Sequence, residues 1–251
     1  MRVRLKFQKY GAMKFIGHLD LMRYFQKAFR RAKFDNEYTK GFNPHQIMSF
    51  AAPLGLGLTS EGEYLDIELR SSDSPEAMIK RINAVLTEGF RVSGFYILKE
   101  VEEGRKSISA MALVSAADYM ISLKDGYEEE IPFSSQDDFQ DAFKKFLRQD
   151  EILIEKRTKK AKKIVDLKTM IKQIDIPYSL EGSIADEYKN GIKVFLQLDT
   201  GSRSNLKPEL VMEAFCKHYH ITYNEYAWQV HRLEMYARGD NNNLIPLKNA
   251  N

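Results

Sequence analysis

The sequence of 251 residues has one cysteine and no long hydrophobic run. Cys216 has no partner for an intrachain disulfide, and the cysteine clusters that hold structural zinc or iron–sulfur centres are missing. A membrane-spanning helix needs about 18 consecutive apolar residues, and none occur together here. Residues 2–7 alternate charged and apolar side chains, which is not the pattern of a signal peptide. The sequence therefore predicts a cytoplasmic protein with no membrane segment and no cofactor of its own.

The net charge is also small, because the sequence has 38 Lys and Arg and 35 Asp and Glu, which gives a formal charge of +3. A field this weak does not indicate a nucleic-acid partner, so only local clusters of charge can. The phosphate loop ending in Lys-Ser/Thr, the dinucleotide-binding GxGxxG and the zinc-binding HExxH motif are all absent. Five histidines are scattered along the chain, and we predict no metal site.

Apolar periodicity predicts a βαββαβ order in residues 1–105. Val3, Leu5 and Phe7 alternate with polar residues, as in a half-buried strand. Ser74 followed by Pro75 is a typical helix start. The same reasoning gives strands at 2–8, 46–52, 63–69 and 91–100, and helices at 18–33 and 75–89.

Residues 106–238 repeat this order, with strands expected at 119–123, 151–155, 191–198 and 228–236 and helices at 135–148 and 208–218. Residues 165–176 fit either a helix or a strand, and we interpret them as an insertion. Residues 239–251 lack periodicity, which predicts a flexible tail. The predicted fold is α+β, with two tandem ferredoxin-like halves built on antiparallel sheets, the second carrying a basic insertion.

The first half holds the densest cluster of polar side chains. His18, at the start of a predicted helix, can act as an acid, a base or a hydrogen-bond donor, and helix starts favour anions such as phosphate. If this helix packs beside the loop that follows it, their polar side chains converge. Candidate catalytic residues are therefore His18, Asp20 and His45, and candidate RNA-binding residues are Arg23, Arg30, Arg31, Lys40 and Asn43.

Each of these residues also has a purely structural interpretation. His18 can cap or pack the helix end, and Arg30 with Arg31 can form a solvated helix face. The segment Gly41-Phe-Asn-Pro-His45 can be only a rigid turn. Aromatic residues able to stack on bases, which more often belong to a core, are Tyr38, Phe42, Phe95 and Tyr96.

A basic run lies in the second half, where six of the eight positions from 156 to 163 are cationic. Such runs hold phosphate backbones without reading sequence, although a charged hairpin tip is as common. This run adds six candidate RNA-binding residues: Lys156, Arg157, Lys159, Lys160, Lys162 and Lys163.

Several motifs together resemble a family of unknown function linked to radical S-adenosylmethionine enzymes, DUF2344. They are Phe15-Ile-Gly-His-Leu-Asp-Leu-Met-Arg23, Arg30-Arg-Ala32, Gly41-Phe-Asn-Pro-His45, Gly62-Glu-Tyr-Leu-Asp66 and Gly201-Ser-Arg-Ser-Asn-Leu-Lys-Pro-Glu209. Gly17 stands where the family usually has Ser, which removes one hydroxyl from the candidate site. The resemblance implies a free-standing partner of a separately encoded radical enzyme, and the absence of a three-cysteine cluster agrees with that form.

These observations favour an accessory protein that binds RNA, or a substrate linked to RNA, for the separate radical enzyme. One alternative is a stand-alone RNA-processing or group-transfer enzyme that uses His18 and His45 as acid and base, which requires both imidazoles in one pocket. Another alternative is a protein-binding scaffold. The RNA hypothesis rests partly on analogy with other tandem ferredoxin-like proteins.

Overall fold

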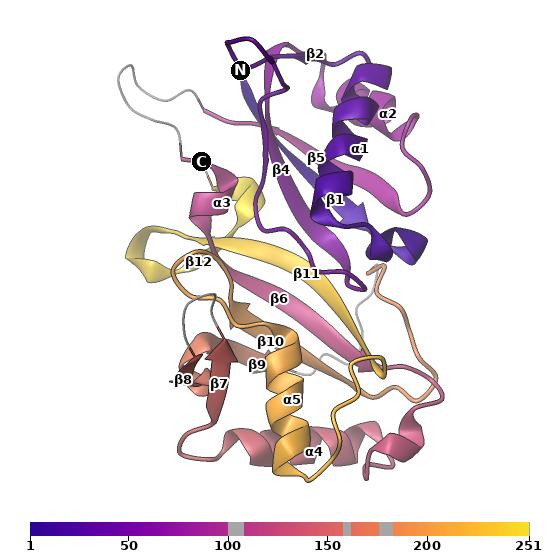
Figure 1. Cartoon of the computed structure of the whole chain (residues 1–251), viewed down its shortest axis with the longest axis vertical. Helices are drawn as coiled ribbons and strands as arrows, with labels where there is room; N and C mark the ends of the chain where they lie inside the picture. Colours follow the sequence, from indigo (N-terminus) through magenta and orange to yellow (C-terminus); the bar gives the residue numbers. More distant parts are fainter. Residues whose placement is uncertain (100–107, 158–161, 176–182, 251) are drawn as a thin grey trace.

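A computed structural model describes residues 1–99, 108–157, 162–175 and 183–250, which form a mixed α+β fold around one large, mostly antiparallel sheet (Figure 1). The sheet runs in the order β5-β1-β4-β11-β6-β10-β9. These strands are β1 (Arg2–Lys9), β4 (Thr59–Ser71), β5 (Phe90–Ile97), β6 (Val114–Leu123), β9 (Ile171–Asp175), β10 (Lys193–Asp199) and β11 (Trp228–Arg238). Short strands β2 (Asp35–Asn36) and β3 (Met48–Phe50) pair with β4, and β12 (Leu244–Pro246) pairs with β11.

The first half of the chain pairs its strands in the order β5-β1-β4-β3, all antiparallel. Helices α1 (His18–Arg31) and α2 (Pro75–Asn83) supply its core with apolar side chains at helical spacing. Phe25 and Phe29 of α1 pack with Leu5 and Phe7 of β1, so the alternation predicted for the opening strand is confirmed. Ser74 caps α2 by accepting a hydrogen bond from the N–H of Ala77.

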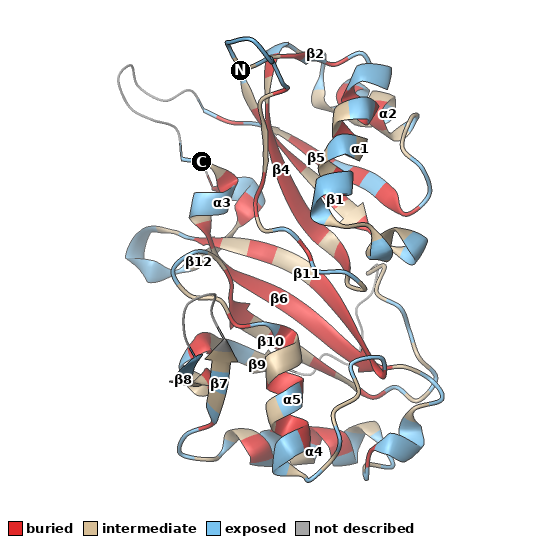
Figure 2. Cartoon of the chain, in the orientation of Figure 1, coloured by how far each residue is buried: buried red, intermediate tan, exposed pale blue. Residues whose placement is uncertain are grey.

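The second half orders its strands β11-β6-β10-β9, also antiparallel. Helices α4 (Gln136–Leu147) and α5 (Pro208–His218) cover one face with stacked rings, among them Phe143 and Phe215 at 4.9 Å between centroids. The short helix α3 (Ala110–Leu113) precedes β6. Figure 2 shows the buried residues concentrated along β4, β11 and β6, between the helices of the two halves. Each half therefore builds its own hydrophobic core.

The two halves share the sheet through a parallel pairing of β4 with β11, in which Thr59 lies opposite His231 and Ser60 opposite Arg232. The sequence predicted separate sheets and did not anticipate this pairing. The predicted boundary at residue 105 lies outside the described residues.

The predicted insertion at 165–176 belongs in part to the sheet. Its residues end β8 (Lys162–Asp166), form the 3-10 turn η3 (Leu167–Met170) and continue as β9, which pairs with β10. The strand predicted at 151–155 instead corresponds to β7 (Leu153–Arg157), which pairs only with β8 in a separate two-stranded ribbon. The sequence could not assign β9, because a strand of only five residues with two spaced isoleucines, Ile171 and Ile174, is too short for periodicity to distinguish it from a helix.

The C-terminal residues 239–250, predicted as a flexible tail, carry regular structure. They contain η4 (Asp240–Asn242), β12 and η5 (Leu247–Asn249), and Leu247 and Ala250 are buried. The buried guanidinium of Arg4 donates hydrogen bonds to both of their carbonyls, at 2.8 and 2.6 Å. A segment without apolar periodicity can still be fixed when its backbone carbonyls satisfy a buried cation.

Candidate nucleic-acid interface

Helix α1 presents a stripe of cations on its outer face. Leu21, Phe25 and Phe29 are buried, while Arg23, Lys27 and Arg30 are exposed at spacings of four and three residues. Side chains at these spacings are neighbours on a helix surface. Among the described residues, only Arg23 of the three pairs with a carboxylate, in an exposed contact of 3.5 Å with Asp20 that adds little stability. The stripe is therefore largely free to contact an anion.

Arg31 lies at the seam between α1 and the end of the following helix. Its Nη2 donates to the carbonyl oxygen of Val85 at 3.1 Å, and its guanidinium lies 5.9 Å from the ring centre of Tyr24. Lys80 and Arg81 of α2 add further positive charge, although Arg81 pairs with Asp73 at 2.9 Å. These contacts hold the Arg31 side chain in place, in contrast to the exposed side chains of the stripe Arg23, Lys27 and Arg30 beside it.

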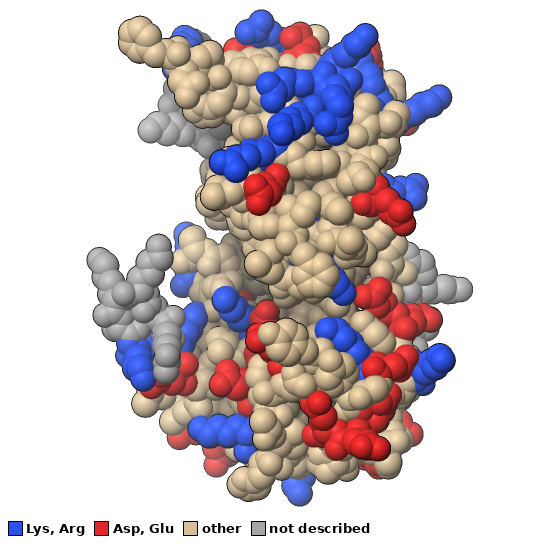
Figure 3. Space-filling model, turned by 45° about the vertical axis from the view of Figure 1, so that its right-hand side comes forward, with Lys and Arg blue, Asp and Glu red and all other residues tan. Residues whose placement is uncertain are grey.

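Charge is divided between the two ends of the molecule. Residues 1–99 contain 16 Lys and Arg against 10 Asp and Glu, whereas residues 100–251 contain 22 against 25. Figure 3 shows Lys and Arg gathered over the upper part, where α1 and α2 lie, and Asp and Glu gathered over the lower part. The net charge of +3 conceals this separation, which favours an anionic partner at the upper end.

The turn between β2 and β3 is closed by hydrogen bonds and anchored to α1. Thr39 and His45 exchange two of them: the Thr39 N–H donates to the His45 carbonyl at 2.9 Å, and the His45 N–H donates to Thr39 Oγ1 at 3.1 Å. Next along the chain, the Gln46 amide donates to the Gln26 carbonyl of α1 at 3.3 Å. Phe42 at the tip is fully exposed, and so are Lys40 and Asn43.

His18 and His45 have different surroundings. The ring of His18 packs edge-on against Phe50 at 5.3 Å, at the start of α1. His45 adjoins Gln46, whose side chain contacts the Gln26 carbonyl of α1. Gln26 lies eight residues beyond His18, which is about 12 Å along the helix axis. His45 Nδ1 contacts Thr39 Oγ1 at 3.1 Å. The two imidazoles therefore contact different residues, and among the described residues no hydrogen bond joins them.

The basic run of the second half lies on the β7–β8 ribbon. Lys156 stands directly opposite Lys163, and Lys156 Nζ donates to the Asn205 carbonyl. Lys162 forms an ion pair with Glu155 at 3.0 Å, and Lys163 is exposed. Arg157 lies opposite Lys162 in the ribbon, while Lys159 and Lys160 lie outside the described residues.

Sequence reasoning missed a buried ionic network where β4 meets β11. Arg232 donates to Glu63 through Nε at 2.8 Å and to the Ala52 carbonyl at 2.7 Å. Arg4 forms a bidentate pair with Asp66 at 2.7 and 3.0 Å. The motif Gly62–Asp66 therefore supplies structural carboxylates. Alternation assigns Asp66 to the face opposite Leu65 and Ile67 and so gave no sign of its burial, whereas Glu63 shares the face of those two apolar residues.

Lys9 lies beside this network and is buried, which lowers its pKa, an effect that Glu63 opposes and Arg232 adds to. Nearby, His231 of β11 contacts two residues of β4. Its Nδ1 lies 2.8 Å from Thr59 Oγ1, and its Nε2 lies 3.6 Å from the Glu61 carboxylate. Lys9 and His231 are buried where the halves meet and Glu61 is partly exposed, so these groups belong mainly to the junction between the halves.

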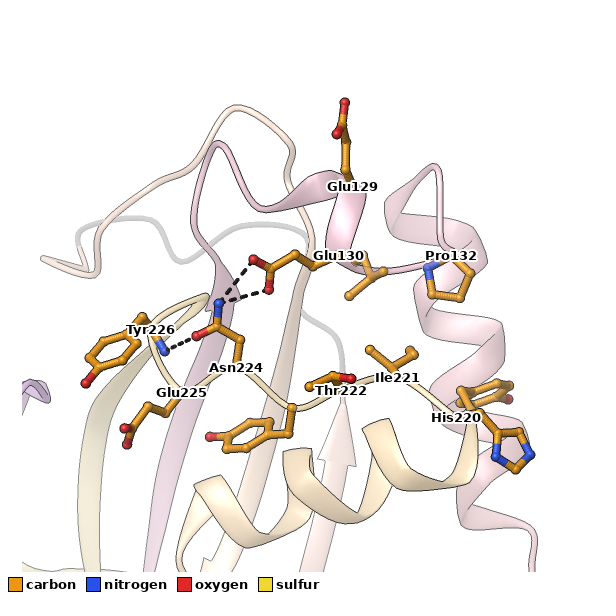
Figure 4. Close-up of a pocket in the computed structure, with 12 residues that line it drawn as sticks. Glu129, Glu130, Pro132, His220, Ile221, Thr222, Asn224, Glu225 and Tyr226 are labelled. Atoms are coloured by element: carbon orange, nitrogen blue, oxygen red, sulfur yellow. Dashed lines mark hydrogen bonds between the residues drawn. The ribbon is translucent and has the colours of Figure 1, made fainter.

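A wide hollow of about 850 Å³ lies at the lower end, between η2 (Glu128–Glu130) and residues 219–226 (Figure 4). Glu129, Glu130 and Glu225 line it, and the Asn224 amide donates to both carboxylate oxygens of Glu130 at 3.1 and 3.0 Å. Its carboxylates would repel phosphate. The sequence already indicated an acidic surface here, because residues 125–141 contain seven acidic residues and no Lys or Arg.

The described helices include none that is both long and apolar enough to cross a membrane. Among the same residues, no group of three or more His, Cys, Asp or Glu is placed to hold a metal ion.

A family profile described as "Uncharacterized protein conserved in bacteria (DUF2344)" matches residues 2–208. The chain belongs to this family. No curated protein matches the sequence of this DUF2344 member. A solved structure described as "Crystal Structure of a Cbf5-Nop10-Gar1 Complex" is similar over 93% of the chain, at 9% identity and a TM-score of 0.45, and the chain spans about half (48%) of its length. A likeness this distant carries no functional argument.

Proposed function

We propose that this DUF2344 protein is a non-catalytic accessory protein that binds RNA, or a substrate linked to RNA. The observation that supports this most directly is the exposed cationic stripe Arg23, Lys27 and Arg30 of α1, at the positive end of a molecule whose charge is divided. Phosphate contacts of this kind supply most of non-specific nucleic-acid affinity. The two imidazoles contact different residues, which gives no support to the enzymatic alternative.

The strand orders support reading the molecule as two tandem ferredoxin-like units that share one sheet. In this proposal the first unit holds RNA through α1, and the β7–β8 ribbon of the second unit contributes Lys163. The acidic lower end remains free of nucleic acid and is available to a protein partner.

We further propose that the protein partner is a separately encoded radical S-adenosylmethionine enzyme. The family resemblance supports this step, and with Cys216 as its only cysteine the chain cannot hold an iron–sulfur cluster alone. Affinity purification of the native protein should retain such an enzyme together with RNA. Recovery of the enzyme with no RNA, before and after nuclease treatment, would instead support the scaffold alternative.

RNA binding can be tested with a variant that replaces Arg23, Lys27 and Arg30 by Ala. Measured over a salt series, the wild-type affinity should fall steeply with ionic strength, and the triple variant should lower the slope of log K against log salt by about 2, because each lost phosphate contact with a single strand removes about 0.7. The variant should keep the wild-type unfolding midpoint, since all three side chains are exposed.

The matched control replaces Lys144, Lys145 and Arg148, which are exposed at the end of α4 in the acidic half. It removes the same charge and should leave the salt slope unchanged. An equal loss of RNA affinity in both triple variants would mean that binding depends only on the net charge of the protein. Absence of binding to total cellular RNA at low salt would refute the proposed function.

A further inference from the structure

The exposed ring of Phe42 points to the form of RNA that this site takes. Resting on the proposed function, we infer that the first half binds single-stranded RNA, with one unpaired base stacked on Phe42 and the adjoining backbone along the Arg23–Arg30 stripe of α1. Phe42 packs against no described core residue and is fully exposed at the tip of its turn. Its ring therefore adds no burial to the fold and is available to an aromatic partner.

The turn that carries Phe42 is held in a defined shape. Two hydrogen bonds between Thr39 and His45 close it, the bridge between Tyr38 and Gln46 extends it, and Pro44 fixes one backbone angle inside it. Gly41 has φ of +118°, a conformation that side chains rarely adopt. A ring displayed by such a turn loses little conformational freedom on binding.

The groups beside the ring match what a flipped-out nucleotide presents. Lys40 and Asn43 flank Phe42 and are exposed, offering a cation for phosphate and an amide for a base edge. Gln46 ties the turn to Gln26, which stands on α1 between Arg23 and Arg30. Those two arginines are about 10 Å apart along the helix, long enough to contact successive phosphates of one strand.

A duplex cannot use this arrangement. Bases in an A-form helix are stacked inside it, and its major groove is too deep and narrow for side chains to reach them. Duplex RNA would contact only the cations, whereas a single strand offers both a base face and a backbone. Phe42 should therefore matter for single strands alone.

The test uses the full chain with an unstructured RNA oligonucleotide and with the same sequence as a duplex, followed by fluorescence anisotropy. Phe42→Ala should weaken single-strand binding about tenfold, the effect of losing one stacked base, while Phe42→Trp should retain it. Neither change should alter the salt slope or the duplex affinity. The control is Tyr226→Ala, which removes an exposed aromatic ring from the acidic half and should have no effect.

A 2-aminopurine placed in the single strand gives a second readout, because stacking quenches its fluorescence. Wild type should quench it and Phe42→Ala should not. If Phe42→Ala binds the single strand as wild type does while the α1 triple variant loses binding, the stacking inference is wrong and the proposed function survives. If wild type binds no RNA, both are wrong.

Discussion

Gly62 stands where β4 and β11 come so close that no side chain fits between them. A Cβ at this position would lie 2.5 Å from the Leu233 carbonyl oxygen and 2.7 Å from the Glu234 Cα, both backbone atoms that cannot rotate away. We expect Gly62→Ala to lower the free energy of unfolding by about 1–3 kcal/mol or more, since overpacking forces the strands apart. Urea denaturation followed by the fluorescence of Trp228, the single tryptophan, measures this.

Gly55→Ala is the matched control, because a Cβ there meets only the flexible Leu58 side chain at 3.7 Å. Its unfolding free energy should differ from wild type by less than about 0.5 kcal/mol. Equal stability of the two variants would show that the strands are not in this close contact.

Glu61 gives a residue-scale prediction about pH. Burial alone raises the pKa of its carboxyl, but the nearby His231 imidazole and hydrogen bonds from the Ile184 N–H and Ser183 outweigh burial and lower the pKa below the usual 4.5. Its ionised form therefore stabilises the folded state above pH 4.5, and this contribution disappears as the pH falls through the lowered pKa. Glu61→Gln should reduce unfolding free energy by on the order of 1 kcal/mol at pH 7. The difference should vanish near pH 3 in denaturation curves.

Asp118 should behave in the opposite way. Burial raises the pKa of its carboxyl, although hydrogen bonds from Tyr236 and Gln197 lower it in part. A raised pKa means that the folded state binds the proton more tightly, so stability falls as the pH rises from 3.8 through the folded value. Asp118→Asn should therefore be as stable as wild type or more stable at pH 7, with less pH dependence between pH 4 and 7. A loss as large as that of Glu61→Gln would contradict this.

At the scale of elements, the parts that sequence predicted well are those with strong periodicity. Alternation placed β1 and the regular part of β4, and apolar stripes placed α1, α4 and α5. Element pairing was harder, because β4 joins β11 across 172 residues and nothing local in Thr59 or His231 signals it. The cationic stripe was predictable from spacing alone. The relative placement of His18 and His45 could not be predicted, because proximity along the chain does not reveal how the turn that follows α1 is placed beside the helix.

The β7–β8 ribbon has an energetic conflict that suggests a prediction. Lys156 and Lys163 stand directly opposite each other, and like charges in this position are destabilising. Lys163→Glu should stabilise the ribbon by about 0.2–1 kcal/mol. The same change should weaken RNA binding and lower the salt slope by about 0.7 if the ribbon contacts one phosphate. Anisotropy titrations measure the affinity and urea denaturation measures the stability.

Lys189→Glu serves as the control for this element, since Lys189 is exposed near the acidic surface. It alters the charge equally and should leave the salt slope as in wild type. A ribbon variant that binds RNA with unchanged affinity and slope would restrict the interface to the first half.

At the scale of the whole molecule, the halves are joined by more than one connection. The parallel contact of β4 with β11 carries the buried pair of Arg232 with Glu63, and beside it Lys6 of β1 forms a partly buried pair with Glu234 of β11. The C-terminal segment then crosses back, because Arg4 of β1 holds the carbonyls of residues that follow β12. Removing one partner of such buried groups leaves the other unsatisfied, which couples the stability of the two halves.

Leu247 tests that coupling, because its side chain is fully buried in the core of the second half while its carbonyl accepts a hydrogen bond from Arg4 of the first. Leu247→Ala should lower the unfolding free energy by about 2–5 kcal/mol, the usual cost of emptying a buried leucine site. If the halves are coupled, Trp228 fluorescence and far-ultraviolet circular dichroism should shift together in one transition. Leu56→Ala, at an exposed loop position, should leave both unchanged. A variant in which Trp228 reports early unfolding while much of the circular dichroism persists would show that the halves unfold independently.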